Sequence, residues 1–215
     1  MMGAFFMRGT PVETSAHVLT YMDTGLRWDE PFRARTSQIC IHWTGAENTP
    51  SDAFRNMSAK RYSVHFIVDQ AGMAYQFADT SCFCAHASGI NDRSIGIEVV
   101  NRANAAVPDK GIKRALVNEL IHGQTVAYRD FLPAQVATVI ALCESLCDAY
   151  EIPMVVPMRG DHVRTDVLSK PELATYRGVI GHMHTKVGKL DPGAKILRAV
   201  AARAQARKRS PPLIG

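Results

Sequence analysis

An α/β fold, with one central mixed β-sheet flanked by helices, is predicted by the sequence. Segments rich in Ile and Val with strand-like alternation recur through the first half of the chain, and a long amphipathic helical segment follows them. Strands interleaved with helices are typical of an α/β domain. The 215 residues are 47% hydrophobic and 21% charged, which suits one globular domain with a sizeable core.

The clearest strand is expected at 37–43, SQICIHW, where Ile39 and Ile41 alternate with Cys40 and His42. This alternation places the two isoleucines on one face of a sheet and the histidine on the other. The remaining strands are expected at 63–77 (two, joined by a tight turn at 70–72), 94–102 (SIGIEVVNR), 154–158 and 177–182.

Three helices are expected. Thr49 before Pro50, with Asp52 in the first turn, is a typical helix start, and this helix is expected to run through Lys60. The other two are expected at 133–150, where apolar residues recur at helical spacing, and at 194–206.

The chain divides into three parts. Residues 1–35 are expected to form an N-terminal extension packed on the domain, residues 36–200 the domain itself, and residues 201–215 a basic C-terminal tail that frays after residue 206. Residues 103–132 are interpreted as a long polar loop with helix-like patches on the binding side, because long connections in compact domains are often functional.

Charge and cysteine usage narrow the function. The formal charge of +5 and pI of about 9.0 favour an anionic partner, such as a cell-wall polymer or nucleic acid. No apolar run is long enough for a transmembrane helix, and the start of the chain is a poor secretory signal. The five cysteines include no CxxC pair, which argues against a disulfide framework or a zinc knuckle.

Four residues could carry metal chemistry. His42 and His182 each stand at the end of an expected strand, Glu98 lies within one, and Asp191 lies in the segment GHMHTKVGKLDPG. Catalytic zinc sites use three such side chains and leave the fourth position open. Taken singly, each residue has an ordinary explanation: a hydrogen-bonded core histidine, an exposed strand glutamate, or a turn aspartate.

The order of the motifs adds weight to the metal interpretation. IHWTG, SVHFIVDQAG, CAHASG, SIGIEVVN and GH…KLDPG follow one another along the chain. In this order they resemble the zinc-dependent N-acetylmuramoyl-L-alanine amidases, a family that includes phage lysozyme-type amidases, anhydromuramyl-peptide amidases and peptidoglycan recognition proteins. The resemblance covers about residues 38–199, including HGQTVAYRDFLPAQ before the long helix.

The resemblance implies one Zn²⁺ ion bound by His42, His182 and Asp191. It implies that Glu98 acts as the general base and that Lys189, in K-x-D-P-G, stabilises the oxyanion. The implied reaction is hydrolysis of the amide that joins N-acetylmuramic acid to L-alanine of the stem peptide.

The resemblance also implies supporting roles. His86, Trp43 and Asn101 are assigned to the substrate-binding groove, and His65 is expected to stand behind the ligands. His184 occupies a position where relatives often carry aspartate, so it is expected to support His182 or to face solvent.

Two departures from the family pattern affect these assignments. Cys84 replaces the usual Trp before His86, which affects stacking in the groove. The loop between His182 and Asp191 is one residue short of the common pattern and lacks its proline, which leaves the path of residues 185–188 open. A metal site at the C-x-C-x-H run that ends at His86 is disfavoured, because the resemblance assigns that histidine to the groove.

A phage or prophage endolysin is the expected setting, with the protein cytoplasmic until it is released to the periplasm or cell wall. The alternatives are a cytoplasmic amidase that recycles 1,6-anhydromuramyl peptides, and a non-catalytic peptidoglycan-binding module. A monomer is expected, attracted to the anionic cell envelope through the basic tail; nucleic-acid binding by that tail is the disfavoured alternative.

Overall fold

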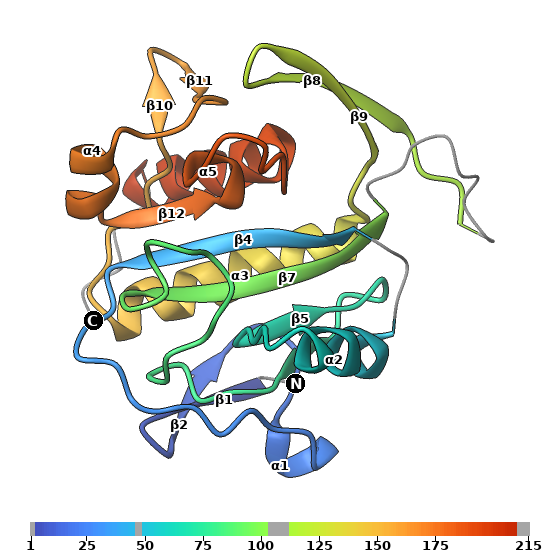
Figure 1. Ribbon diagram of the computed structural model, residues 1–215, viewed down its shortest axis with the longest axis vertical. Helices are drawn as coiled ribbons and strands as arrows, with labels where there is room; N and C mark the ends of the chain where they lie inside the picture. Colours follow the sequence, from blue (N-terminus) through green and yellow to red (C-terminus); the bar gives the residue numbers. More distant parts are fainter. Residues whose placement is uncertain (1–2, 46–48, 103–111, 210–215) are drawn as a thin grey trace.

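A six-stranded mixed sheet forms the centre of the computed structural model, which describes residues 3–45, 49–102 and 112–209 (Figure 1). Its strands lie in the order β12 (Gly178–Gly181), β4 (Gln38–Gly45), β7 (Ser94–Arg102), β5 (Phe66–Val68), β6 (Ala74–Gln76) and β3 (Val18–Leu19). Neighbouring strands run parallel except β5 and β6, which are antiparallel. The predicted mixed α/β fold is confirmed.

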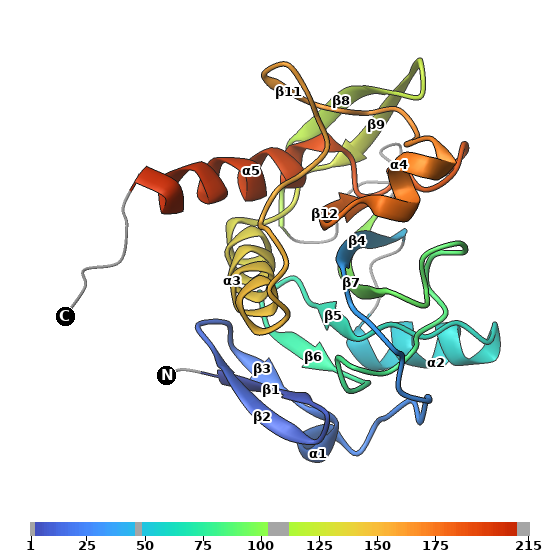
Figure 2. The ribbon, with the colours of Figure 1, turned by 90° about the vertical axis from the view of Figure 1, so that its left-hand side faces the viewer.

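The two faces of the sheet carry different side chains. Ile39 and Ile41 of β4 lie in the main core with α3 (Pro133–Ala149) and α5 (Ala194–Arg209). Cys40 and His42 point to the opposite face, which α2 (Pro50–Ala59) and α4 (Lys170–Thr175) partly cover (Figure 2). Strand alternation therefore separates a dry core from a face that is free to build a site.

Local signals explain where α2 begins. Thr49 caps the helix, because its hydroxyl accepts a hydrogen bond from the backbone N–H of Asp52 at 3.1 Å. Pro50 occupies the first helical position, where its missing N–H costs nothing. The helix ends at Ala59, with Lys60 as its C-cap, as predicted.

The N-terminal segment is bonded into the sheet. It forms a hairpin of β1 (Gly3–Met7) and β2 (Thr10–Thr14), then the edge strand β3 and the short helix α1 (Tyr21–Thr24). Phe5 is fully buried in the main core, and the Gln76 amide makes hydrogen bonds to both the backbone N–H and C=O of Phe6. The division of the chain at residue 35 stays a prediction.

The prediction of a polar loop at 103–132 is wrong for residues 116–129. Residues 116–129 form an antiparallel hairpin of β8 (Leu116–Ile121) and β9 (Gln124–Arg129). His122 and Gly123 both have positive φ, 51° and 78°, as a two-residue hairpin turn requires. The available signal was the pair of segments LVNELI and QTVAYR, which contain β-branched and aromatic residues and flank a short turn at Gly123. Residues 103–111 lie outside the described part of the chain.

Two smaller expectations also change. The segment 154–158 forms no strand before Met158, which begins β10 (Met158–Arg159); this strand pairs with β11 (His162–Val163). The last helix continues to Arg209 instead of fraying after residue 206, because Arg203 and Arg207 form ion pairs with Glu144 and Asp148 of α3.

All five cysteines are buried, and none of them forms a disulfide bond. In the described ranges, no helix has the length and apolar character needed to cross a membrane.

Candidate metal centre

Three neighbouring parallel strands place three candidate residues in one row. His42 of β4 and Glu98 of β7 are paired in register, and Gly181 of β12 pairs with Ile41, one residue earlier. His182, the next residue after β12, therefore comes to lie beside His42. The site therefore lies on one face of the sheet, at the middle of β4 and β7 and at the end of β12.

Asp191 reaches the same place from the loop that follows. The 3-10 helix η1 (His182–His184) turns the chain away from the sheet, and the N–H of Met183 donates to the C=O of Asp191 at 2.8 Å. Gly181 makes the close return possible: a Cβ there would lie 2.6 Å from Cδ of Pro192.

The three expected ligands form a compact triangle of donor atoms. Nδ1 of His42 lies 3.0 Å from Nδ1 of His182 and 3.2 Å from Oδ2 of Asp191, and the third side measures 3.1 Å. Donors bound at about 2.0–2.1 Å to one tetrahedral ion are separated by roughly 3.3 Å. The triangle therefore fits a single Zn²⁺-sized ion.

The protonation states of His42 and Asp191 also suit metal binding. Burial, with the neighbouring His182, lowers the pKa of His42 to about 4, so its imidazole is neutral at pH 7. Burial would raise the pKa of Asp191, but its polar contacts with His182 and His42 outweigh burial and lower that pKa. A carboxylate and neutral imidazoles are the forms that bind metal.

Glu98 is held close by without a partner. Among the described residues, none donates a hydrogen bond to its buried Oε2. Burial and the charge of Asp191 raise the pKa of Glu98 to about 8, although Lys189 opposes this shift. A carboxyl group with a pKa near neutrality can both accept and donate a proton, as a general acid–base catalyst must.

These residues line a cleft of about 880 Å³, which we call the active-site cleft. Its walls come from β4, β7, α2, the segment 85–91 and the loop that carries Asp191. Four basic residues border it: Lys60, Arg61, Lys186 and Lys189. Lys189 is exposed at the cleft edge, as its expected role in binding an oxyanion requires.

The expected groove residues do not all lie in the cleft. His86 lines it and contacts His42. Trp43 borders it, but its ring packs against Tyr128 at 5.0 Å between centroids. His65 is fully buried, 6.0 Å from the ring of His86, and binds the backbone N–H of Gly96.

The structure places Asn101 outside the substrate-binding groove to which it was assigned. Its side chain is fully buried, outside the cleft, so it cannot bind substrate. The amide Nδ2 donates to the C=O of Arg129 at 2.7 Å, and Oδ1 accepts from Arg114 at 2.6 Å. Asn101 therefore joins β7 to the end of the β8–β9 hairpin.

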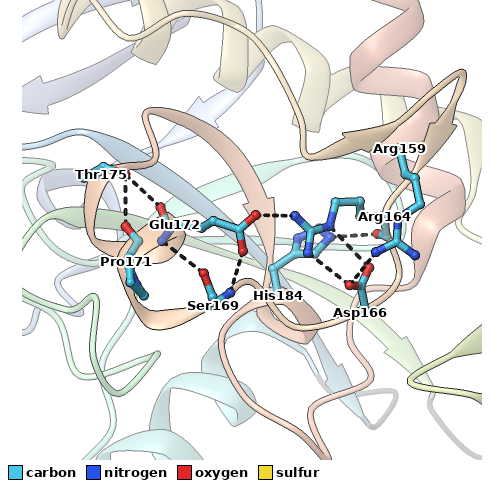
Figure 3. A network of polar contacts seen from close by, with 8 residues as sticks. All are labelled: Arg159, Arg164, Asp166, Ser169, Pro171, Glu172, Thr175 and His184. Carbon is cyan, nitrogen blue, oxygen red and sulfur yellow. Dashed lines mark hydrogen bonds and ion pairs between the residues drawn. The ribbon is translucent and has the colours of Figure 1, made fainter.

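His184 has a structural role that the sequence left open. It is fully buried, and its Nδ1 accepts the N–H of Gly181 at 3.0 Å. Its Nε2 donates to the C=O of Arg164 at 2.8 Å (Figure 3). The guanidinium of Arg164 in turn binds Asp166 and Glu172. His184 therefore supports the turn that carries His182.

A second group of residues that could hold a metal ion shares one member with the first. Cys40, His42 and His86 also have ligand atoms within 4.8 Å of one another. Sequence reasoning missed this group, because Cys40 lies inside an apolar strand and offers no motif.

A three-ligand site beside an unpaired carboxyl group, in a cleft open to a large substrate, is suited to metal-assisted hydrolysis. The sequence identifies the class more narrowly, because the model of the N-acetylmuramoyl-L-alanine amidase family matches residues 32–194. The chain belongs to this family of peptidoglycan-cleaving enzymes, as the motifs predicted. No curated protein gives a significant match to the sequence.

Solved structures share the fold. The endolysin LysCS, an N-acetylmuramoyl-L-alanine amidase from Clostridium intestinale URNW, matches with a TM-score of 0.58 and 15% identity over 87% of this chain and 95% of that one. The endolysin of the Thermus scotoductus MAT2119 bacteriophage Ph2119 matches at 0.54 and 14%, over 87% and 99%. One chain of the complex of peptidoglycan recognition proteins LCa and LCx, solved with bound tracheal cytotoxin, matches at 0.53 and 15%, over 85% and 95%.

Proposed function

We propose that this protein is a zinc-dependent amidase that cleaves the bond between N-acetylmuramic acid and L-alanine in peptidoglycan. The observation that carries the proposal is the triangle of His42, His182 and Asp191, with sides of 3.0–3.2 Å, beside the unpaired Oε2 of Glu98. A Zn²⁺ ion held by the triangle would supply Lewis-acid chemistry at the amide carbonyl.

The protein's own groups handle the proton and the developing charge. Glu98, when ionised, accepts a proton from the attacking water and then gives it to the leaving amine. The ammonium group of Lys189 approaches the cleft from its exposed edge and stabilises negative charge on the carbonyl oxygen.

The basic residues that border the cleft support the inference that the substrate is anionic. Lys60 and Arg61 follow α2, and Lys186 and Lys189 lie on the facing loop. Stem peptides carry free carboxylates, which such a border attracts. The fold shared with recognition proteins solved with tracheal cytotoxin supports the same substrate class.

For the biological setting we favour a phage-type endolysin, which acts after release from the cytoplasm, because two endolysins share this fold. Attraction to the anionic envelope would come from the end of α5. Arg203 and Arg207 are already paired with α3, so Lys208 and Arg209 are the better candidates for this contact. Deleting residues 208–215 should weaken wall association and raise its salt sensitivity; unchanged association would contradict this part of the proposal.

The test is digestion of intact sacculi and of soluble anhydro-muropeptides, with products identified by mass spectrometry. The proposal expects free stem peptides that begin with L-alanine, released from sacculi, and none from His182→Ala. Glycan fragments without free stem peptides would contradict the cleaved bond. Release from anhydro-muropeptides alone would favour the recycling amidase over the endolysin.

A further inference from the structure

His86 contacts the side of His42 that faces away from the proposed ligands. The two rings meet edge to face, with centroids 5.1 Å apart, and Nδ1 of His86 lies 3.0 Å from Nε2 of His42. The other nitrogen of His42, Nδ1, faces His182 and Asp191. The two nitrogens of His42 therefore have separate partners.

The hydrogen bonds around Ser94 define which nitrogen of His86 carries the proton. The hydroxyl of Ser94 donates to the C=O of Ile90 at 2.8 Å, so its only proton is already used. Its oxygen lies 3.1 Å from Nε2 of His86 and must accept there. The C=O of Ser94, 3.5 Å from the same nitrogen, can also only accept. Nε2 of His86 is therefore the protonated nitrogen.

The position of the proton on His86 in turn determines which nitrogen of His42 carries a proton. With its proton on Nε2, neutral His86 has a lone pair on Nδ1, which accepts a hydrogen bond from Nε2–H of His42. The lone pair of His42 is thereby left on Nδ1, which points at the other two members of the triangle. The arrangement runs in one direction, from His42 through His86 to Ser94.

Two sets of contacts hold His86 in this position, one beneath its ring and one at its backbone. Its ring lies over Gly96, where an added Cβ would come within 2.8 Å of Cγ of His86. The side chain of Asn91 accepts hydrogen bonds from the backbone N–H groups of His86, at 3.1 Å, and Ala87, at 2.7 Å. Neither contact needs a bound substrate.

We propose that His86 is a positioning residue, which fixes the tautomer and orientation of His42 for metal binding. This inference rests on the proposed zinc site. It replaces the expected role of His86 in the groove, because the ring nitrogens of His86 are both engaged by protein groups. Histidine ligands usually donate their second N–H to such a partner, and losing that partner costs about 10- to 100-fold in metal affinity.

The test measures zinc affinity by competition with a fluorescent chelator in the full-length protein. His86→Leu is expected to bind Zn²⁺ about 10- to 100-fold more weakly than the wild type. His86→Asn is expected to recover most of this loss, because its Oδ1 can accept the proton of His42 near the position of Nδ1. Ser94→Ala is expected to fall between them, and it tests the same arrangement if His86→Leu does not fold.

Three results would overturn the proposal. Equal affinities of His86→Leu and the wild type, with only KM raised, would return His86 to substrate binding. Equal loss in His86→Asn and His86→Leu would show a packing role alone. Two Zn²⁺ ions per wild-type chain, one of them lost in Cys40→Ala, would make His86 a ligand of the second group. A wild-type protein that binds no zinc would instead refute the proposed function itself.

Discussion

His42 on β4 and Glu98 on β7 are paired residue for residue on adjacent parallel strands. The proposed ligand and the proposed base are therefore held by backbone hydrogen bonds of the central sheet, not by loops. Such rigid placement is what catalytic groups need, because small errors in position cost large factors in rate.

Replacing Glu98 by Gln should separate proton transfer from metal binding. The amide keeps the shape of the side chain but cannot accept the proton of water. We expect kcat to fall by about 100- to 10,000-fold. Zinc affinity, measured in parallel by chelator competition, should stay within a few-fold of wild type. An active Glu98→Gln enzyme would exclude Glu98 as the base.

The same residue should set a pH dependence of stability in the metal-free protein. Burial and Asp191 raise the pKa of Glu98 to about 8 in the folded state. The unfolded chain releases this proton near pH 4.3, so Glu98 makes the free energy of unfolding fall as pH rises from about 4.3 to 8. His42, with its pKa lowered to about 4, acts in the opposite sense below about pH 6.5.

Comparison of the wild type with Glu98→Gln isolates the glutamate, because both proteins keep His42. In urea unfolding at pH 8, the variant should be more stable by on the order of 3 kcal/mol. The difference should shrink toward pH 5. A difference that does not vary with pH would mean that Glu98 titrates normally.

Glu119 should matter for the position of Asp191. Its Oε2 accepts the N–H of Ala194, the first residue of α5, at 2.6 Å, and the hydroxyl of Tyr128 at 2.7 Å. We expect Glu119→Ala to destabilise the protein by about 1–3 kcal/mol, since it leaves buried donors unpaired. Zinc affinity should fall as well, because only Pro192 and Gly193 separate Asp191 from the start of α5. Glu13→Ala, at an exposed position on β2, is the matched control.

The correction at Asn101 can be checked by the kind of defect that its loss causes. Because its amide is buried and bonded to Arg129 and Arg114, Asn101→Ala should lower the free energy of unfolding by about 1–3 kcal/mol. KM for muropeptides should be unchanged at temperatures where the variant is folded. A raised KM with normal stability would restore the role in substrate binding.

Much of the fold could be predicted, because its signals are local. Strand β7 was predicted residue for residue, and the start of α2 followed from Thr49 and Pro50. The β8–β9 hairpin was missed because its outer face carries both apolar and polar residues, including Leu116 and Leu120, which blurs the alternation.

The site was predictable in its members but not in its hydrogen bonds. Ordered motifs identified His42, His182 and Asp191 as one group, and the structure brings them together. The direction of the bond from His42 to His86 depends on where the hydroxyl of Ser94 donates, which only coordinates reveal. Asn101 was misassigned because it lies on the same strand as Glu98, whereas its amide is buried against β9.

Reconstitution of the metal-free enzyme tests the central claim most directly. The chelator-treated protein is titrated with Zn²⁺ while stem-peptide release from sacculi is measured. We predict no release without metal, and release that rises linearly and stops increasing at one Zn²⁺ per chain. Full release by the metal-free protein, or the same titration curve from His182→Ala, would contradict a zinc site built from His42, His182 and Asp191.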